Sequence, residues 1–211
     1  MAIVAMIIGQ SGTGKSASPR NLDPEQTAVI NVSGKPMPFR GELKCWNTDD
    51  YAKITEAVRS TDRPVIVIDD ASYLMVDEFM RNAKVQGYQK FTDIAVNFFS
   101  LVRLCAMLPA DKTVYFLGHV DTDVNGAEKF KTIGKLLDEK VTLEGLFTIV
   151  LKTVVQDGHY YFSTQNSGSD TVKSPMGMFD EALIPNDLAE VDKAIRNYYG
   201  MTAINVKKGA K

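Results

Sequence analysis

The residues from Gly9 to Ser16 have the types and the spacing of a phosphate-binding loop. They read GQSGTGKS, which fits the pattern G-x-x-x-x-G-K-[ST]. Glycines let such a loop curl until its N–H groups point at phosphate oxygens, Lys15 is expected to reach the terminal phosphates, and the Ser16 hydroxyl is expected to bind Mg²⁺. The residues expected around the phosphates are Gly9, Gln10, Ser11, Gly12, Thr13, Gly14, Lys15, Ser16 and Ala17.

A second acidic ligand for the metal is expected at the end of the apolar run VIVIDD. Asp69 ends this run, where a Walker B aspartate holds magnesium through water. Asp70 is the nearest carboxylate available to orient an attacking water, although a helix N-cap or a solvated turn explains it equally well. Glu42, which follows an earlier apolar run, is a rival catalytic base.

Histidine ends another apolar run, VYFLGH. At the tip of that run, His119 is expected to contact the terminal phosphate and to sense its loss. His159 lies in a different sequence context, beside Asp157 and Gly158, and is given only a structural role.

An α/β fold is needed to bring these side chains together. Apolar runs rich in β-branched residues predict strands at 2–8, 27–32, 64–69, 113–119 and 146–155. Helices are expected after the glycine loop, where Pro19 is an oddity that shortens or bends the helix, and at 48–60, 72–85 and 91–107. The runs show little alternation, which is typical of a parallel sheet covered by helices on both faces.

The strand sequence also distinguishes between classes of phosphate-loop protein. The glycine loop follows the first strand and Asp69 ends the third, which suits ATPases in which an extra strand separates the two motifs. The N-K-x-D motif of GTPases is absent, and the arginines are scattered rather than clustered in a kinase lid.

The C-terminal part is expected to be a hairpin, a loop and a helix. Asp157 and Gly158 separate two strand-like runs, and Asp187 with Glu190 predicts the start of a helix that ends at Gly200. We expect one domain over 1–211, with its core at 1–155, this C-terminal part at 156–200 and a loose tail at 201–211.

Composition limits the function and the location. The 211 residues carry a net charge of −2, so any nucleic-acid binding requires a local basic patch. Cys45 and Cys105 lack metal-ligand spacing and are expected to be buried thiols in a reducing compartment. With no membrane-spanning run and no basic leader, the chain is expected to be an unprocessed cytoplasmic protein.

Segments along the chain resemble those of one family, the phage-encoded RecA-like core ATPases of the AAA-family ATPase type. The segments are GQSGTGKSASPRNLDP, INVSGKPMPFRG, VIVIDD, EFMRNAKVQGYQKFTDI, VYFLGH, KTIGKLLDEKVTLEGLFTIVL and TQNSGSDTVKSPMGMF. The resemblance extends to about residue 180, and the parts at 78–94 and 131–151 are more specific than the Walker motifs. It implies a RecA-like fold, ATP with Mg²⁺, and action on single-stranded DNA in phage recombination or replication.

The same resemblance implies DNA-binding loops and a contact between subunits. DNA-binding loops follow the third and fourth core strands of RecA-like proteins, and the matching positions here are Arg81, Lys84, Tyr88, Lys90, Lys129 and Lys131. A solvated helix face and a loop explain these residues nearly as well. Lys135, or in its place Lys131 or Lys140, is expected to reach the terminal phosphate bound by a neighbouring subunit of a ring or filament.

Two other functions are compatible with the motifs. One is an AAA-type helicase loader that acts on a protein partner, although a loader is expected to carry a C-terminal helical lid. The other is a nucleotide-responsive binding module that hardly hydrolyses ATP. Because the first strand is expected to begin at residue 2, with no arm before it, annealing, remodelling or loading is favoured over strand exchange.

Overall fold

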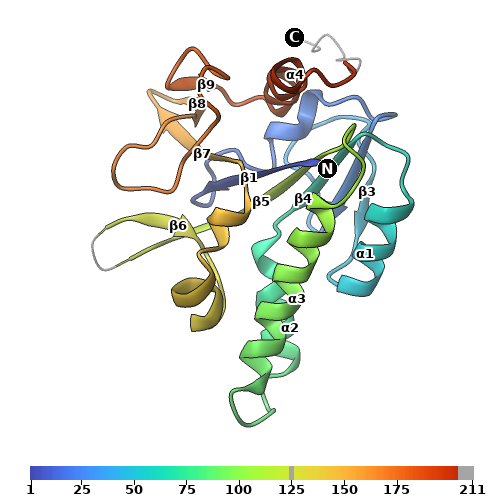
Figure 1. Ribbon diagram of the computed structural model, residues 1–211, viewed down its shortest axis with the longest axis vertical. Helices are drawn as coiled ribbons and strands as arrows, with labels where there is room; N and C mark the ends of the chain where they lie inside the picture. The colour runs from blue at the N-terminus through green and yellow to red at the C-terminus, as the bar shows by residue number, and fades with distance from the viewer. Residues whose placement is uncertain (124–125, 204–211) are drawn as a thin grey trace.

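The computed structural model describes residues 1–123 and 126–203, whose strands form a nine-stranded sheet flanked by helices (Figure 1). The strands are β1 (Ile3–Gly9), β2 (Thr27–Asn31), β3 (Cys45–Asn47), β4 (Val65–Asp69), β5 (Thr113–Thr122), β6 (Glu128–Phe130), β7 (Ile149–Gln156), β8 (His159–Ser163) and β9 (Leu183–Pro185). Their order is β3-β2-β4-β5-β1-β7-β8-β9, with β6 beside β5. Strand β5 therefore separates β1 from β4.

The first part of the sheet is parallel and the last part is antiparallel. Strands β3, β2, β4, β5, β1 and β7 pair in parallel, whereas β8 and β9 continue the sheet as antiparallel neighbours. The turn between β7 and β8 has positive φ at Asp157 (52°) and Gly158 (76°), as the predicted two-residue hairpin requires. The chain is therefore α/β, with a mixed, mostly parallel sheet.

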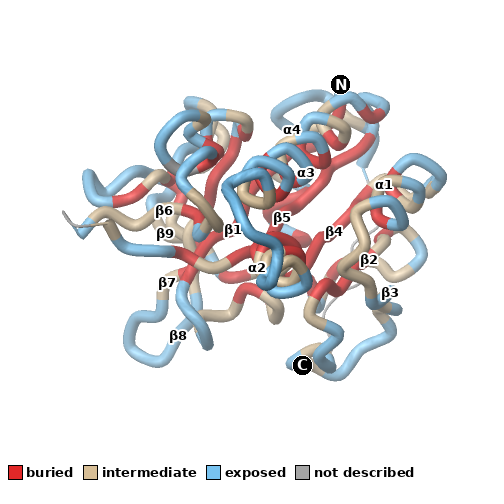
Figure 2. The backbone as a smooth tube through the Cα atoms, turned by 90° about the horizontal axis from the view of Figure 1, so that it is seen from below, coloured by how far each residue is buried: buried red, intermediate tan, exposed pale blue. Residues whose placement is uncertain are grey.

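Helices cover both faces of the sheet. The helices are α1 (Tyr51–Ser60), α2 (Ser72–Arg81), α3 (Gln89–Ala106) and α4 (Leu188–Tyr199), with the short turns η1 (Ser18–Asn21), η2 (Leu136–Val141) and η3 (Leu143–Leu146). Buried side chains of α1, α2 and α3 pack on one face, and those of α4 pack on the other. Burial is accordingly concentrated in the central strands and on the inner sides of the helices (Figure 2).

Helix α4 is fixed to the sheet by a buried ion pair. Arg196 Nε donates to Asp192 Oδ2 over 2.6 Å, and both side chains are almost fully buried. Asp192 Oδ1 accepts from the hydroxyls of Thr113 and Tyr115 on β5. Because the guanidinium also donates to backbone carbonyls, including that of Pro64, these buried charges are well satisfied.

Most of the predicted elements are confirmed, with bounds that differ by up to four residues. Helix α4 begins after its predicted cap, since Asp187 Oδ1 accepts from the Ala189 N–H, and it ends at Gly200, whose φ is 64°. The prediction of helix to residue 85 is wrong, because α2 ends at Arg81. The three-residue strands β3, β6 and β9 were not predicted.

The helix predicted after the glycine loop is wrong. The chain forms only the four-residue 3₁₀ turn η1, with Pro19 in its first positions. Pro19 lacks the N–H that an α-helix starting in the loop would need, and Pro24 disfavours helical backbone at Asp23. No more than four residues separate these prolines, which leaves too little room for an α-helix.

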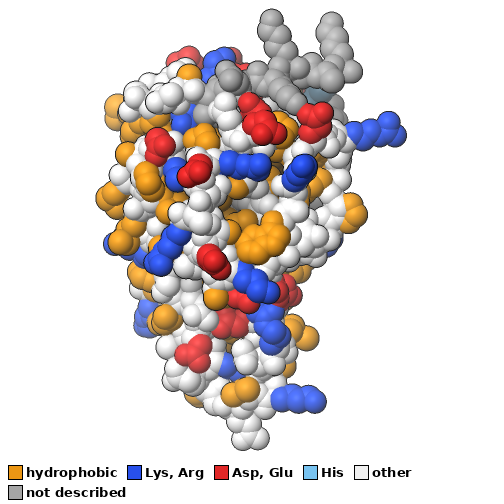
Figure 3. Space-filling model, turned by 90° about the vertical axis from the view of Figure 1, so that its right-hand side faces the viewer, with side chains coloured by type: hydrophobic (Ala, Val, Ile, Leu, Met, Phe, Trp, Pro, Cys, Tyr) orange, Lys and Arg blue, Asp and Glu red, His pale blue; other side chains and the backbone are white. Residues whose placement is uncertain are grey.

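Other observations bear on the expected surroundings of the protein. Within the described ranges, the structure contains no helix of the length and apolar character required to cross a membrane. On the face drawn in Figure 3, basic side chains alternate with acidic ones, so neither sign forms a continuous field there. The tail expected at 201–211 falls, from residue 204 onward, outside the described residues.

Candidate nucleotide-binding site

The carboxyl ends of four parallel strands meet at one edge of the sheet. In the pairing of β2 with β4, Asn31 lies opposite Asp69, and in the pairing of β1 with β5, Gly9 lies opposite His119. Ligands of open α/β sheets bind outside this edge. The fold thus brings the glycine loop, the predicted metal ligand and the predicted sensor to the same place.

The backbone of the glycine loop depends on its glycines. Gly12 and Gly14 have φ angles of 78° and 96°, a region that side chains with a Cβ rarely adopt. At Gly9 the limit is space, because an added Cβ would lie 1.8 Å from Thr153 Oγ1 on β7. Thr153 Oγ1 also lies 2.6 Å from Thr13 Oγ1, which donates to the Gln10 carbonyl. The loop is therefore held against β7 by contacts that only glycine permits.

Lys15 is folded into the loop. Its Nζ donates to the carbonyls of Gly9 (2.9 Å) and Gln10 (2.7 Å), and the residue is only 5% exposed. Burial lowers the pKa of Lys15, and the nearby positive charge of Lys35 adds to this effect, while Asp70 and Asp69 oppose it. The loop carbonyls therefore hold a cation that an incoming anion can attract.

The two predicted metal ligands are in direct contact. Ser16 Oγ donates to Asp69 Oδ1 over 2.9 Å, across 53 positions of sequence. Burial, and then the negative charge of Asp70, raise the pKa of Asp69 to about 6. A divalent cation beside these oxygens would favour the ionised carboxylate again. Asp69 therefore lies in an environment suited to a cation.

Asp70 is placed at the centre of a small group of charged and aromatic side chains. Its carboxylate lies 3.4 Å from Lys35 Nζ and 3.5 Å from His119 Nε2. Burial and the positive charge of Lys15 lower the pKa of His119, which favours the neutral form of this imidazole. Asp70 also has a φ of 58°, an uncommon conformation for a residue with a side chain. Such strained backbone is concentrated at functional sites.

A cavity of about 760 Å³ lies over these residues. Its lining combines the glycine loop, the ends of β2, β4 and β5, and two C-terminal segments. The residues are Ser11, Gly12, Gly14, Lys15, Ser16, Ala17, Arg20, Asn31, Ser33, Lys35, Pro36, Pro38, Phe39, Asp69, Asp70, His119, Gly158, His159, Tyr160, Pro185 and Asn186. The volume is in the range of small-molecule and cofactor sites.

The C-terminal hairpin closes one side of this cavity. The Tyr160 ring lies against the loop, since an added Cβ at Gly14 would be 3.1 Å from its Cδ1, yet the residue is 51% exposed. Asn186 is buried beside it, and its Nδ2 has no hydrogen-bond partner. Arg20 Nη1 donates to the Asn186 carbonyl over 2.7 Å. An aromatic ring and an unsatisfied amide therefore border the part of the cavity next to the loop.

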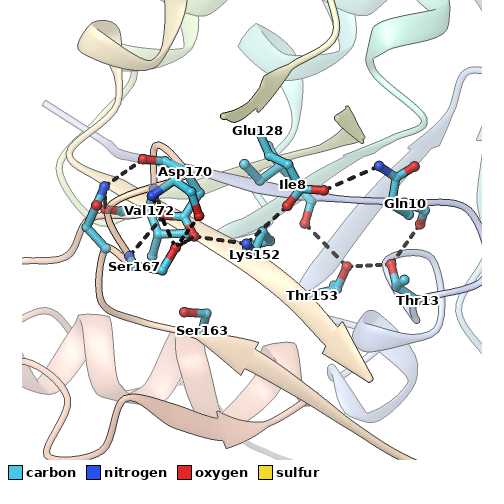
Figure 4. Close-up of polar contacts among 12 residues, drawn as sticks. Ile8, Gln10, Thr13, Glu128, Lys152, Thr153, Ser163, Ser167, Asp170 and Val172 are labelled. Carbon is cyan, nitrogen blue, oxygen red and sulfur yellow. Dashed lines mark hydrogen bonds and ion pairs between the residues drawn. The ribbon is translucent and has the colours of Figure 1, made fainter. Parts of the chain in front are cut away.

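A network of ion pairs braces the outer side of the loop (Figure 4). Lys152 Nζ on β7 lies 2.9 Å from Asp170 Oδ2 and 3.1 Å from Glu128 Oε2, and Gln10 Nε2 donates to Glu128 Oε1 over 3.3 Å. Asp170 also accepts from the Ser167 hydroxyl. The glycine loop, strand β6 and the segment around residue 170 are thereby joined through one lysine.

The first group of predicted DNA-binding residues lies on the turn between α2 and α3 and on the adjoining helix ends, a region that projects beyond the sheet (Figure 1). Arg81 forms an ion pair with Asp49, and Lys90 Nζ donates to the Val85 carbonyl over 2.8 Å. Lys84 is exposed and Tyr88 is 88% exposed. Lys84 and Tyr88 are thus the members of this group most available to a partner.

The second group lies nearer the site. Lys129 belongs to β6, and the exposed Lys131 donates its backbone N–H to the His119 carbonyl. Lys135 points to solvent, 3.5 Å from Glu139, and Gly134 beside it packs against the Phe91 ring of α3. In the described part of the chain, none of these lysines lines the cavity. Residues 124 and 125, which belong to the predicted DNA-binding loop, lie outside the described residues.

The structure also separates the two candidate bases and reveals residues that the sequence reasoning missed. Asp70 lines the cavity, whereas Glu42 is exposed and, within the described residues, does not line it. Lys35, Tyr160 and Asn186 line it without having been predicted. The Gly-Lys pair two residues after a predicted strand was the available signal for Lys35. Tyr160 and Asn186 gave no signal, because their position depends on how the C-terminal part packs.

The chemistry of this donor set fits magnesium bound together with phosphate. Among residues 1–123 and 126–203, no cluster of three or more His, Cys, Asp or Glu side chains forms a self-sufficient metal site. Magnesium is usually held by one or two protein oxygens together with substrate phosphates and water, a role that Ser16 and Asp69 can fill.

The chain matches no protein-family profile, and no curated protein matches it.

Proposed function

We propose that this protein binds ATP with Mg²⁺ in the cavity at the sheet edge and hydrolyses it. The observation that carries the proposal is the contact of Ser16 with Asp69, 2.9 Å apart, beside a glycine loop whose lysine is buried. This combination of groups suits a phosphate with magnesium. The glycine loop and its lysine would bind the phosphate, and Ser16 and Asp69 would bind the metal. The unsatisfied Asn186 Nδ2 further supports a ligand with polar groups.

Each part of the site has a role in this proposal. The loop amides and Lys15 bind phosphate oxygens, with Lys15 exchanging the Gly9 and Gln10 carbonyls for them. Ser16 and Asp69 hold Mg²⁺, which would neutralise charge on the phosphate oxygens when bound. Asp70 orients water for attack on the terminal phosphorus, and His119 contacts the terminal phosphate. The bond that breaks joins the terminal phosphorus to its bridging oxygen, giving ADP and inorganic phosphate.

The order of the strands supports a RecA-like assignment. Strand β5 lies between β1, which leads into the glycine loop, and β4, which ends in Asp69. This arrangement is the one expected of ATPases with an extra strand between the two motifs. The four-residue turn η1 departs from the longer helix expected after such a loop. Phosphate binding here must depend on loop amides and Lys15 rather than on a helix dipole.

Single-stranded DNA is the partner that we propose for the ATPase. Lys84 and Tyr88 offer a cation and an exposed ring on the α2–α3 turn, which suits a phosphate contact and base stacking. The contact of Gly134 with Phe91 brings the segment around Lys135 beside the start of α3. Assembly into a ring or filament would be one source of a second cation, because it would place Lys135 of one copy near the site of another.

A nucleotide-responsive module with little hydrolysis is the second candidate. It is favoured by the position of Asp70, whose carboxylate is engaged by Lys35 and His119 instead of being available to water. The helicase loader receives less support, because α4 packs on the sheet and does not form a separate lid.

Phosphate release measured with Mg²⁺ and ATP tests the proposal. The wild type is expected to release phosphate faster when single-stranded DNA is present. Lys15→Ala and Asp69→Asn are expected to reduce the rate at least about 100-fold, the range found when one charge-stabilising group is removed. Lys53→Ala, which removes an exposed lysine of α1, is the matched control. A wild type that binds ATP but releases no phosphate would instead favour the nucleotide-responsive module.

A further inference from the structure

The segment after β2 is built to present one lysine to the cavity. The buried Asn31 side chain donates from Nδ2 to the Lys35 carbonyl over 2.6 Å, and its Oδ1 accepts from the Gly34 N–H over 3.0 Å. Ser33 Oγ lies 3.3 Å from the same oxygen, and Gly34 has a φ of 66°. Asn31, which is only 2% exposed, thus fixes the backbone at Gly34 and Lys35. Lys35 itself is a charged residue at the surface of the cavity.

The Lys35 ammonium lies among groups of the candidate site. Its Nζ is 3.4 Å from Asp70 Oδ2 and 5.0 Å from the centre of the Tyr73 ring. Lys15, Lys35 and His119 all line the cavity, so these three cationic or protonatable groups face a common space. The side chain is 63% exposed, which leaves it free to move towards a ligand.

We propose that Lys35 is a catalytic residue that contacts the terminal phosphate of ATP and stabilises the charge that develops there during hydrolysis. This inference rests on the proposed function. Lys15 and Lys35 would enclose the terminal phosphate, and Asp70, released from Lys35, would become available to the attacking water. When a triphosphate binds, the Lys35 ammonium would therefore exchange Asp70 for the phosphate, and the Asp70 carboxylate would exchange Lys35 for water.

This assignment has a consequence for assembly. A lysine supplied by the same chain provides the transition-state cation that was expected from Lys135 of a neighbouring subunit. Turnover per subunit is then independent of protein concentration. Lys135 is exposed and paired with Glu139, which is consistent with a role elsewhere.

Calorimetric binding of Mg·ATP and Mg·ADP, compared between variants, tests the inference. Because ADP lacks the terminal phosphate, Lys35→Ala is expected to weaken ATP binding about tenfold and to leave ADP binding unchanged within about twofold. The turnover number is expected to fall at least about 100-fold. Lys35→Arg should keep most of the ATP preference, since it retains the charge.

Controls separate this inference from the proposed function. Lys53→Ala removes a lysine with the same 63% side-chain exposure on α1 and should change neither affinity. Failure of the wild type to bind either nucleotide would remove the proposed function itself. If the wild type binds both but Lys35→Ala leaves the ratio of affinities and the turnover unchanged, or only lowers the melting temperature, Lys35 has no catalytic role.

Discussion

At the scale of single residues, the side chains on the C-terminal side of the cavity are suited to contact the base of the proposed nucleotide. Tyr160 presents an exposed ring beside Gly14, and Asn186 brings an unsatisfied amide to the same region. Aromatic rings stack on bases, and asparagine pairs well with the adjacent donor and acceptor of adenine. The phosphate subsite and the base subsite should therefore be separable by mutation.

Tyr160→Ala is expected to weaken ATP binding by about 1–3 kcal/mol, the amount typical of one base–aromatic contact. Binding of inorganic tripolyphosphate should not change, because this ligand has no base. Competition titrations with the two ligands measure the difference. Tyr198→Ala, which removes an exposed tyrosine on α4, serves as the control. Equal weakening of both ligands would show that Tyr160 supports the loop and does not contact the base.

The residue scale also shows which residues of the candidate site the sequence points to. The place of the loop and of Asp69 in the candidate site could be predicted because both belong to short, contiguous sequence motifs, GQSGTGKS and VIVIDD. Tyr160 gave no sequence signal and Lys35 gave only the Gly-Lys pair, because each enters the cavity from a segment whose position depends on distant packing. The contacts of Asp70 with Lys35 and His119 likewise depend on β2, β4 and β5 lying side by side in the sheet.

At the scale of elements, the brace around Lys152 joins the glycine loop to the C-terminal segments (Figure 4). Burial alone would raise the pKa of Asp170. Hydrogen bonds from Ser167 and Lys152 outweigh this effect and lower the pKa below its usual 3.8. An acid with a lowered pKa in the folded state stabilises the fold above the pKa of the unfolded state. Its contribution is lost as the pH falls below about 4, through the folded pKa.

Asp170→Asn is expected to lower the free energy of unfolding by about 1–3 kcal/mol at pH 7, because it weakens a buried charge-assisted contact. The difference from the wild type should narrow below about pH 4, where the wild-type carboxylate also becomes protonated. Urea denaturation over this pH range provides the measurement. Asp180→Asn, at an exposed position, is the control. A difference that is constant with pH would mean that the ionised carboxylate is unimportant.

The α2–α3 turn is the element that we propose contacts single-stranded DNA. Lys84→Ala should flatten the dependence of log affinity on log salt by about one unit, the change expected for one lost phosphate contact. Tyr88→Ala should weaken binding with little effect on that slope, since stacking releases no counterions. Fluorescence anisotropy with labelled single-stranded DNA measures both, with Lys193→Ala on α4 as the control. Undetectable DNA binding at low salt would favour a protein partner.

Element prediction depended on the length and the pattern of each segment. The long apolar strands and helix α4 were predictable, because continuous burial and a capped, amphipathic sequence are strong local signals. Strands of three residues, such as β3 and β6, contain too few positions for a pattern. The absence of an α-helix after the loop follows from Pro19 and Pro24 acting together, whereas Pro19 alone predicts only a shortened or bent helix.

At the scale of the whole molecule, the sheet order decides which strand ends meet. The apolar runs predicted a parallel sheet, but pairing partners are chosen by packing between segments far apart in sequence, so the position of β5 between β1 and β4 was only suggested. The buried pair of Asp192 and Arg196 then holds α4 on the second face. The cavity is consequently shared between the N-terminal strands and the C-terminal hairpin.

The central claim is that this shared cavity binds Mg·ATP through the glycine loop. Isothermal titration of the whole protein with ATP, with and without Mg²⁺, tests it most directly. We expect one site per chain, tighter binding with Mg²⁺, and a loss of about 1.5–3 kcal/mol of binding free energy in Lys15→Ala, as for a hydrogen bond to a charged group. No binding heat in the wild type, or equal affinity in Lys15→Ala, would contradict it.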